Sequence, residues 1–306
     1  MTQTILLGET PLTFEMVSAV ADGAQVQLDP ATRDKVTAAR KLVDDWASGE
    51  TPVYGVTTGF GALAEVKVPQ EQLRALQRNL ILSHAAGVGR HLSQRETRAM
   101  MLLRAQTLSE GHSGCRPQII EFVLELLNRG IHPHIPEKGS VGASGDLAPL
   151  AHIALAIIGE GTVEFDGENL PTREALSRAN LEPIILEAKE GLSLVNGTQA
   201  MSAVGTLALA QAESLCRLAD IAGAMTLEGL AGLASAFDPR IQSIRPHPGQ
   251  MLCATNLRRL LEGSDTNKPA HGNRVQDPYS LRCMPQVHGA TRDALQYARD
   301  VFTREI

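Results

Sequence analysis

The apolar positions of this 306-residue chain recur mostly with a helical period. Between Pro30 and Gly49, four apolar residues share one predicted helix face, and this proline and this glycine are typical of the two ends of a helix. These four residues are Val36, Ala39, Val43 and Trp46. Ser93 and Glu96 form a capping-box pattern ahead of an apolar run, and Pro117 opens another run. The spacing therefore predicts a mainly α-helical protein.

A few segments depart from the helical period. Residues 162–170 alternate apolar and polar side chains around Asp166-Gly167, which predicts a β-hairpin. Three glycine-rich segments show no helical period, namely residues 55–61, 138–146 and 189–197. Residues 243–285 are rich in proline, histidine, asparagine and glycine, and we expect long ordered loops there.

The composition divides the chain into two predicted parts. Residues 1–197 are expected to form an N-terminal helical domain with small β elements. Residues 198–306 begin rich in alanine and leucine and predict the start of a long antiparallel helix bundle. An apolar helical stripe is still running at Ile306, and no capping residue follows it. We therefore expect this sequence to be the N-terminal part of a longer protein.

Composition and charge argue against several classes of protein. The net charge of −6 offers no basic surface for nucleic acid or an anionic membrane. No segment approaches the roughly 20 apolar residues of a membrane span, and the N-terminus lacks the pattern of a signal peptide. The 4 cysteines are widely spaced, which is typical of a reduced, cytoplasmic protein. His132 and His134 lie among prolines without a nearby carboxylate or thiol, so we expect no metal site.

The segment Gly139–Leu150 contains the residues with the most distinctive chemistry. Ser144 stands between small residues, as the nucleophile of a hydrolase does. The nucleophile-elbow pattern G-x-S-x-G is not matched, however, because Asp146 occupies the place of the second glycine. A tight turn is another interpretation, since turns rich in glycine and serine use unusual backbone angles.

A third interpretation is that Ala143, Ser144 and Gly145 cyclise. The Gly145 nitrogen can condense with the Ala143 carbonyl, and loss of the Ser144 hydroxyl as water then leaves an exocyclic methylene. The product, 4-methylideneimidazol-5-one, is an electrophile that needs neither a metal nor a diffusible cofactor. Gly145 has no Cβ to obstruct the attack, Ala143 is small, and Asp146 is placed to support the proton transfers.

This segment resembles the signature of the aromatic amino acid ammonia-lyases, which act on histidine, phenylalanine or tyrosine. Four further motifs resemble the family in the same order along the chain. They are Tyr54-Gly-Val-Thr-Thr-Gly-Phe-Gly61, Asn79-Leu-Ile-Leu-Ser-His84, Asn196-Gly-Thr-Gln199 and Gln276-Asp-Pro-Tyr-Ser-Leu-Arg282. Because the motifs are spread over nearly the whole chain, the resemblance is far more specific than any single one of them.

The resemblance implies a role for each matching residue. The electrophile captures the substrate amine, and Tyr54 is the base that removes the β-proton. Arg282 holds the substrate carboxylate, for which a planar guanidinium is well suited. Tyr279 and Asn196 contact the electrophile and the bound amino acid, and Gln276 lines the same pocket.

His84 bears on the choice of substrate. It continues an apolar stripe formed by Leu73, Leu76 and Leu80, so its side chain is expected to point inward. A histidine in such a place can simply be a hydrogen-bonded core residue. The Ser-His pair resembles the histidine-specific members of the family, which implies L-histidine as the substrate and trans-urocanate as the product.

The family resemblance also implies a homotetramer whose active sites combine residues of several subunits. Within the family, a phenylalanine or tyrosine ammonia-lyase or a 2,3-aminomutase remains an alternative. Outside it, the alternatives are a serine hydrolase that uses Ser144 and a non-catalytic fragment that only folds and assembles. We expect the 306 residues by themselves to be a poor or inactive lyase.

Overall fold

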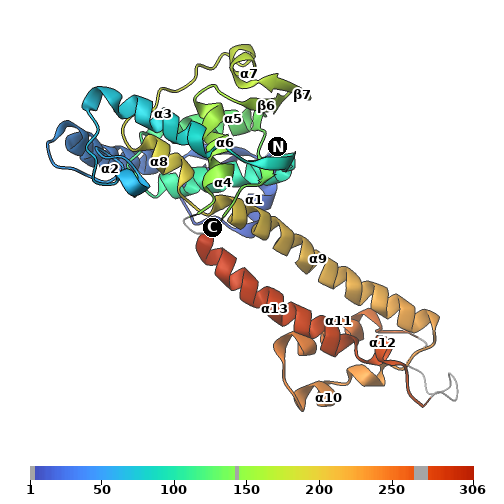
Figure 1. The fold of residues 1–306 in the computed structure, drawn as a ribbon. Coiled ribbons are helices and arrows are strands. Elements are labelled where there is room, and N and C mark those ends of the chain that lie inside the picture. Colours follow the sequence, from blue (N-terminus) through green and yellow to red (C-terminus); the bar gives the residue numbers. More distant parts are fainter. Residues whose placement is uncertain (1–3, 142–144, 265–274) are drawn as a thin grey trace. The chain divides into compact units, whose positions relative to one another are not determined.

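The computed structural model describes residues 4–141, 145–264 and 275–306. The chain forms two compact units: unit 1 is Met1–Leu207 with Ile306, and unit 2 is Ala208–Glu305 (Figure 1). Both units are mainly helical, as predicted. The functional division predicted after residue 197 stays a prediction.

Helix α4, Gln94–Ser109, is the core helix of unit 1. It is buried on every face, which identifies it as a helix that neighbours surround. Helices α1, Phe14–Ala21, and α5, Pro117–Asn128, pack against it. The predicted helix starts are confirmed, because Ser93 and Glu96 form the full capping box and Pro117 stands in the first turn of α5.

Helix α2, Pro30–Ser48, begins at the predicted place, where the Asp29 carboxylate caps the Thr32 amide. Val36 and Val43 are buried as predicted, but Trp46 is 46% exposed. The inward orientation predicted for Trp46 is wrong, because the last turn of α2 is exposed on most sides. Arg40 lies buried on this helix instead, and its guanidinium donates to the carbonyls of Gly114 and Ala188.

Three small sheets accompany the helices among the described residues of unit 1. The strands are β1 (Thr4–Leu7), β2 (Gln25–Leu28), β3 (Val88–His91), β4 (His132–Pro133), β5 (Pro136–Lys138), β6 (Thr162–Phe165) and β7 (Glu168–Pro171). Strands β1 and β2 pair in parallel, β3 pairs with β5, and β4, β6 and β7 form an antiparallel sheet. The predicted hairpin is therefore confirmed as β6 and β7, with helix α7, Thr172–Arg178, directly after it.

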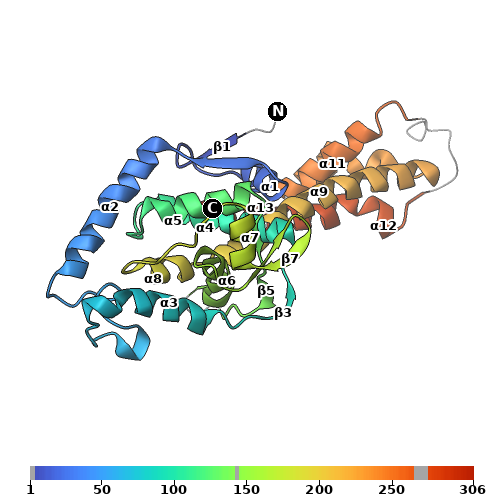
Figure 2. The ribbon, with the colours of Figure 1, turned by 90° about the horizontal axis from the view of Figure 1, so that it is seen from above.

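Three further helices of unit 1 carry or flank the candidate site. Helices α3, Leu73–His84, α6, Leu147–Ile157, and α8, Glu190–Val195, lie side by side (Figure 2). Short helical turns at Gly61–Leu63 and Gln70–Gln72 precede α3. Residues 189–197 were expected to lack helical structure, and α8 shows that this expectation is wrong for its six residues.

Unit 2 contains most of the long helix α9, Gln199–Gly229, and a second set of helices. They are α10 (Pro239–Ser243), α11 (Pro248–Leu260), α12 (Tyr279–Arg282) and α13 (Met284–Glu305), with a short turn at Ala234–Phe237. Helices α11 and α13 pack closely against each other (Figure 1). The long loops predicted for residues 243–285 are therefore wrong for α11, where Pro248 starts a helix instead of breaking one. No helix among the described residues is long and apolar enough to cross a membrane.

A fully buried carboxylate joins several elements of unit 1. Glu190, at the start of α8, accepts hydrogen bonds at 2.7 Å from the Arg116 guanidinium and at 2.8 Å from the Glu187 amide. The Arg40 guanidinium lies 3.8 Å from the same carboxylate. These contacts connect α2, the start of α5 and α8 through one charge.

The Glu190→Ala substitution in the full-length protein is expected to lower the free energy of unfolding by about 3–5 kcal/mol, because it removes one partner of a buried ion pair. Denaturant unfolding followed by circular dichroism measures the change. The matched control is Glu125→Ala, because Glu125 pairs with Arg129 at the surface. We expect the control to cost less than about 1 kcal/mol. Equal losses in the two variants would contradict a structural role for Glu190.

Candidate active site

The loop that carries Gly145 lies against the chain segment between α8 and α9. A Cβ atom on Gly145 would lie 2.5 Å from the Gly197 carbonyl oxygen, and the Gly145 φ angle is +118°. The Asp146 amide donates to this carbonyl at 2.6 Å. Only glycine at position 145 permits this approach. Ala143 and Ser144, the other two residues of the predicted electrophile, lie outside the described residues.

The buried Asp146 carboxylate anchors this loop. One of its oxygens accepts from the Ser140 hydroxyl at 2.5 Å, and the other accepts from the Met201 amide at 2.8 Å. Met201 is in the first turn of α9, where backbone amides have no partner within the helix. Through these bonds Asp146 connects Ser140, on the other side of residues 142–144, to the start of α9.

Arg104 fixes the other side of the Gly145–Gly197 contact. Its guanidinium is completely buried and donates to the Asn196 carbonyl at 3.1 Å, to Gln199 Oε1 at 2.7 Å and to the Ser193 carbonyl. The last carbonyls of a helix lack partners within it, and a cation near them is favourable. Burial lowers the pKa of Arg104 to about 10, so it remains charged at neutral pH.

These residues fit a ring formed from Ala143, Ser144 and Gly145. Cyclisation needs a residue at position 145 whose nitrogen is unobstructed, and the packing on Gly197 leaves no room for a side chain there. It also needs the flanking backbone held in place, and Asp146 provides this anchor through its bonds to α9.

Tyr54 lies in the loop of residues 49–69, between α2 and α3. Its side chain is 54% exposed, and its ring packs edge to face on Phe60 with the centroids 6.3 Å apart. The next residue, Gly55, lies directly against Leu192 of α8. The packing thus joins the Tyr54 loop to the helix that leads to Asn196, whose own side chain is exposed.

His84 is the last residue of α3 and is half-buried, at the end of the predicted stripe. Its Nδ1 lies 2.8 Å from the Leu80 carbonyl oxygen and 3.1 Å from the Ser83 hydroxyl. Because a carbonyl only accepts, Nδ1 carries a proton. Nε2 has no hydrogen-bond partner among the described residues, so it can accept a bond from a ligand.

In unit 2, the structure brings together Gln276, Tyr279 and Arg282. The Arg282 guanidinium carbon lies 4.2 Å above the centre of the Tyr279 ring. With its oxygen turned toward the guanidinium, the Gln276 amide accepts from it at 3.0 Å. Gln276 and Arg282 also line a cavity of about 310 Å³. A planar cation held by an aromatic ring and an amide is suited to binding a carboxylate.

One cluster in unit 2 has the residue types of a metal site. The possible ligand atoms of Asp220, Cys253 and His288 lie within 4.8 Å of one another. The Arg292 guanidinium, however, already pairs with Asp220 at 2.6 Å, and His288 Nδ1 lies 2.8 Å from the same carboxylate. Burial raises the pKa of the Cys253 thiol far above its usual value, so it stays protonated. The cluster resembles a buried hydrogen-bond network more than a cation site.

His132, considered above as a metal ligand, is engaged within unit 1. The Arg98 guanidinium lies 3.1 Å from Nε2 and the Gln94 amide 3.0 Å from Nδ1. Burial, with the Arg98 charge as a smaller cause, lowers the pKa of His132 to about 4.

Arg104 and Gln199, for which the sequence predicted no role, hold the Asn196–Gly197 segment. The signal that points to Arg104 is a charge directly after the apolar run Ala99–Leu103 and before Ala105. Such a residue is buried only with hydrogen-bond partners, so it predicts a carbonyl-rich environment. The identity of that environment depends on residues about ninety positions away, which only the fold brings near.

Known proteins resemble this chain over nearly its whole length. Residues 12–306 match the family model described as aromatic amino acid lyase. The chain is 56% identical to a histidine ammonia-lyase of Stigmatella aurantiaca, covering 98% of this chain and 59% of that protein. The chain therefore belongs to the aromatic amino acid lyase family, and it spans about three fifths of the length of this relative.

Solved structures show the same fold. The ergothionase of Treponema denticola, described as an ergothioneine-degrading enzyme, matches with a TM-score of 0.93 and 33% identity, covering 98% of this chain and 61% of that one. The histidine ammonia-lyase of Trypanosoma cruzi matches with a TM-score of 0.89 and 38% identity, covering 99% of this chain and 56% of that one. Since enzymes with different names share this fold, the fold alone does not identify the substrate.

The Gly145→Ala substitution in the full-length protein tests the contact with Gly197. A matched control is Gly167→Ala, because Gly167 also has a positive φ angle but has open space around its Cβ position. We expect the control to cost about 1 kcal/mol in unfolding free energy from backbone strain alone. Gly145→Ala should cost about 1–3 kcal/mol more, because the added methyl group overlaps the Gly197 carbonyl. Thermal or denaturant unfolding measures both, and equal losses would contradict the close approach.

Proposed function

We propose that the whole protein is an ammonia-lyase that removes ammonia from L-histidine and releases trans-urocanate. The observation that carries the proposal is the 56% identity to a histidine ammonia-lyase, which extends over 98% of this chain. The proposal concerns the whole protein, because the chain spans 59% of the length of that relative. By themselves, the 306 residues are expected to turn over little substrate.

The electrophile is proposed to be 4-methylideneimidazol-5-one, formed from Ala143, Ser144 and Gly145. Once formed, this group offers an electrophilic methylene that binds the substrate amine and makes it a better leaving group. The lack of space for a side chain at Gly145 supports this assignment, as does the anchoring of Asp146 to α9. Asn196 is proposed to donate a hydrogen bond to the ring oxygen, which stabilises negative charge there.

Tyr54 is proposed to remove the β-proton of the substrate. Its phenol is half-exposed, which leaves it accessible to a substrate. Arg282 is proposed to bind the substrate carboxylate through two charge-assisted hydrogen bonds. Gln276 and the Tyr279 ring would limit the rotation of this guanidinium, so less entropy is lost on binding.

His84 is proposed to select the imidazole side chain of histidine. Its Nδ1 proton is directed to the Leu80 carbonyl, which leaves Nε2 as a hydrogen-bond acceptor. A substrate imidazole N–H is a matching donor, whereas a phenyl ring has none. A site built around this bond discriminates against phenylalanine, because His84 would then be left without a partner.

We also propose a homotetramer as the working assembly. Four large apolar side chains of α9 within unit 2 are exposed, which suits a helix that packs against further helices. They are Leu215, Leu218, Ile221 and Met225. A phenylalanine or tyrosine lyase, an aminomutase and a serine hydrolase are the competing functions that the experiments below distinguish.

Replacing Ser144 with alanine in the full-length protein is expected to abolish urocanate formation without unfolding the protein, because the hydroxyl that leaves to create the methylene is gone. Absorbance of urocanate measures activity, and the intact mass shows whether water was lost. Ser177→Ala, at an exposed serine of α7, is the control and should keep full activity. A folded Ser144→Ala enzyme that still forms urocanate refutes the electrophile. Labelling of Ser144 by a fluorophosphonate would favour the hydrolase.

The His84→Leu substitution in the full-length protein is expected to reduce kcat/KM for histidine by about fivefold to a hundredfold, the effect of losing one buried polar partner. Tolerance of phenylalanine should increase in the same variant. The exposed His112 provides the control His112→Leu, which should leave both values unchanged. Unchanged histidine kinetics in His84→Leu would show that His84 is a structural residue.

A further inference from the structure

Gln77 lies where α3 meets the start of α8, and its side chain is fully buried. Its Oε1 atom accepts hydrogen bonds from the Gly191 amide at 2.9 Å and from the Leu192 amide at 3.4 Å. Amides in the first turn of a helix have no partner within it, and the side chain of Lys189, at the N-cap, is no acceptor. Gln77 therefore supplies from α3 the cap that α8 lacks locally.

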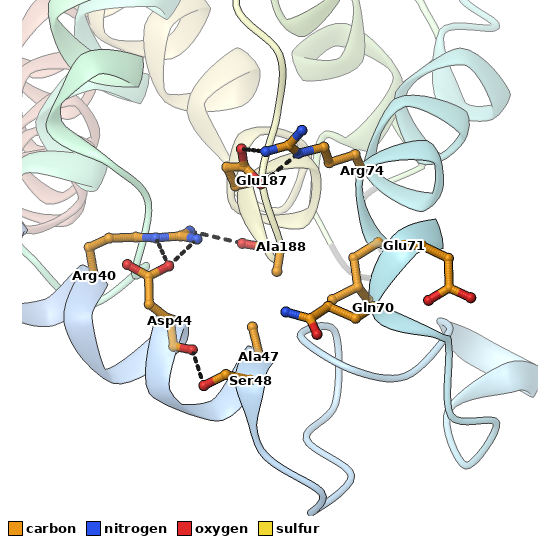
Figure 3. Close-up of a pocket in the computed structure, with 10 residues that line it drawn as sticks. Arg40, Asp44, Ala47, Ser48, Gln70, Glu71, Arg74, Glu187 and Ala188 are labelled. Carbon is orange, nitrogen blue, oxygen red and sulfur yellow. Dashed lines mark hydrogen bonds and ion pairs between the residues drawn. The ribbon is translucent and has the colours of Figure 1, made fainter.

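The two helices are in close contact at this point. A Cβ atom on Gly191 would lie 2.8 Å from the Gln77 carbonyl oxygen and 3.0 Å from its Oε1 atom. A second connection is the pair of Arg74, on α3, with Glu187, which Figure 3 shows at the edge of a polar pocket. The Arg74 side chain is 64% exposed, and such surface pairs contribute little to stability. The buried Gln77 contact is therefore the stronger of these two polar connections.

Two supports hold the backbone around Tyr54. On one side, Val53 and Val56 pack in the apolar cluster that includes Val43 of α2. On the other side, Gly55 lies against α8, where a Cβ atom at its position would be 2.5 Å from Leu192 Cδ2. The segment is therefore held between α2 and α8, and loss of either support would change its position.

Gln77 controls the support on the α8 side. It binds the backbone amide of Leu192, the residue on which Gly55 rests. The Phe60 ring also approaches Gly55, at 3.5 Å from the Cβ position, and it packs edge to face on the Tyr54 ring. The position of the Tyr54 ring thus depends on Leu192, and the position of the Leu192 backbone depends on Gln77.

The Gln77 amide is only partly satisfied by this contact. Its Nε2 group is buried and has no hydrogen-bond partner among the described residues. An unpaired buried donor is unfavourable for stability. A glutamine here therefore costs stability through its nitrogen while its oxygen places α8, which is typical of residues that serve a site.

We propose that Gln77 is a positioning residue for the proposed lyase reaction: through Leu192 it determines where the Tyr54 phenol meets the substrate. A displacement of a reacting group by about 1 Å can slow a reaction about a hundredfold, so a small shift of α8 is sufficient. The consequence for turnover rests on the base role proposed for Tyr54, whereas the effect of Gln77 on the loop does not.

Hydrogen exchange of the full-length protein tests the support itself. Gln77→Met keeps the length of the side chain but removes the oxygen, and we expect faster amide exchange at residues 191–192 and at residues 53–60. The matched control is Gln106→Met, because Gln106 is a buried glutamine of α4 that also has one unpaired amide atom. The control should leave both segments as protected as in the unmodified protein. Unchanged exchange at residues 53–60 in Gln77→Met would overturn the proposal.

A double-mutant cycle tests the link to Tyr54. In Gln77→Met we expect kcat for histidine to fall about tenfold to a hundredfold with KM little changed, because proton removal is impaired and carboxylate binding is not. In a Tyr54→Phe background the same substitution should have little further effect, since no base is left to misplace. A loss by the same factor in both backgrounds would show that Gln77 has a structural role only.

Gln77→Asn provides a milder variant, which keeps a buried amide but ends one methylene short of α8. It should show the same exchange and kinetic effects to a smaller degree. A folded Gln77→Asn protein with normal exchange at residues 53–60 and normal kcat would also overturn the proposal. Faster exchange at residues 53–60 of Gln77→Met, in a protein whose unmodified form has no lyase activity, contradicts the proposed function alone.

Discussion

Buried polar groups hold the segment between α8 and α9, and the geometry of the candidate site depends on them. The Arg104 guanidinium donates hydrogen bonds to carbonyls at the end of α8. The Asp146 carboxylate accepts one from an amide at the start of α9. A buried group that loses such a partner costs about 1–3 kcal/mol, so both helix ends stay in place. Gly145 and Gly197 approach closely because these two side chains fix the backbone on either side.

The Tyr54 loop shares this rigid support. Gly55 rests on Leu192 of α8, close to the segment that Arg104 holds. Near both ends the loop also packs on the core: Val56 is fully buried beside Val43, and Val53 and Val68 pack against the same cluster. For Tyr54, the base proposed above, this packing would position the backbone accurately while the phenol stays half-exposed.

Local signals predicted the helix ends and the hairpin well. Asp29, the Ser93–Glu96 capping box and Pro117 act within a few residues of their position, so their effect does not depend on the remaining fold. The composition of residues 243–285 predicts loops and misses helix α11, because Pro248 stands in the first turn of that helix, where a residue needs no amide partner. Trp46 has the spacing of a core residue, but it lies in the last turn of α2, which is mostly exposed to solvent.

The sequence by itself determined the family, the mainly helical fold and the candidate chemistry, because its motifs are contiguous and each residue type has a chemical reason. Only the tertiary structure decided which groups support them. Arg104 and Asn196, like Glu190 and Arg116, are far apart in the chain and are joined by hydrogen bonds. A charged residue in an apolar run predicts that it has a buried hydrogen-bond partner, but any carbonyl or carboxylate can be that partner. Folding selects the partner, because only packing determines which one comes within hydrogen-bond distance.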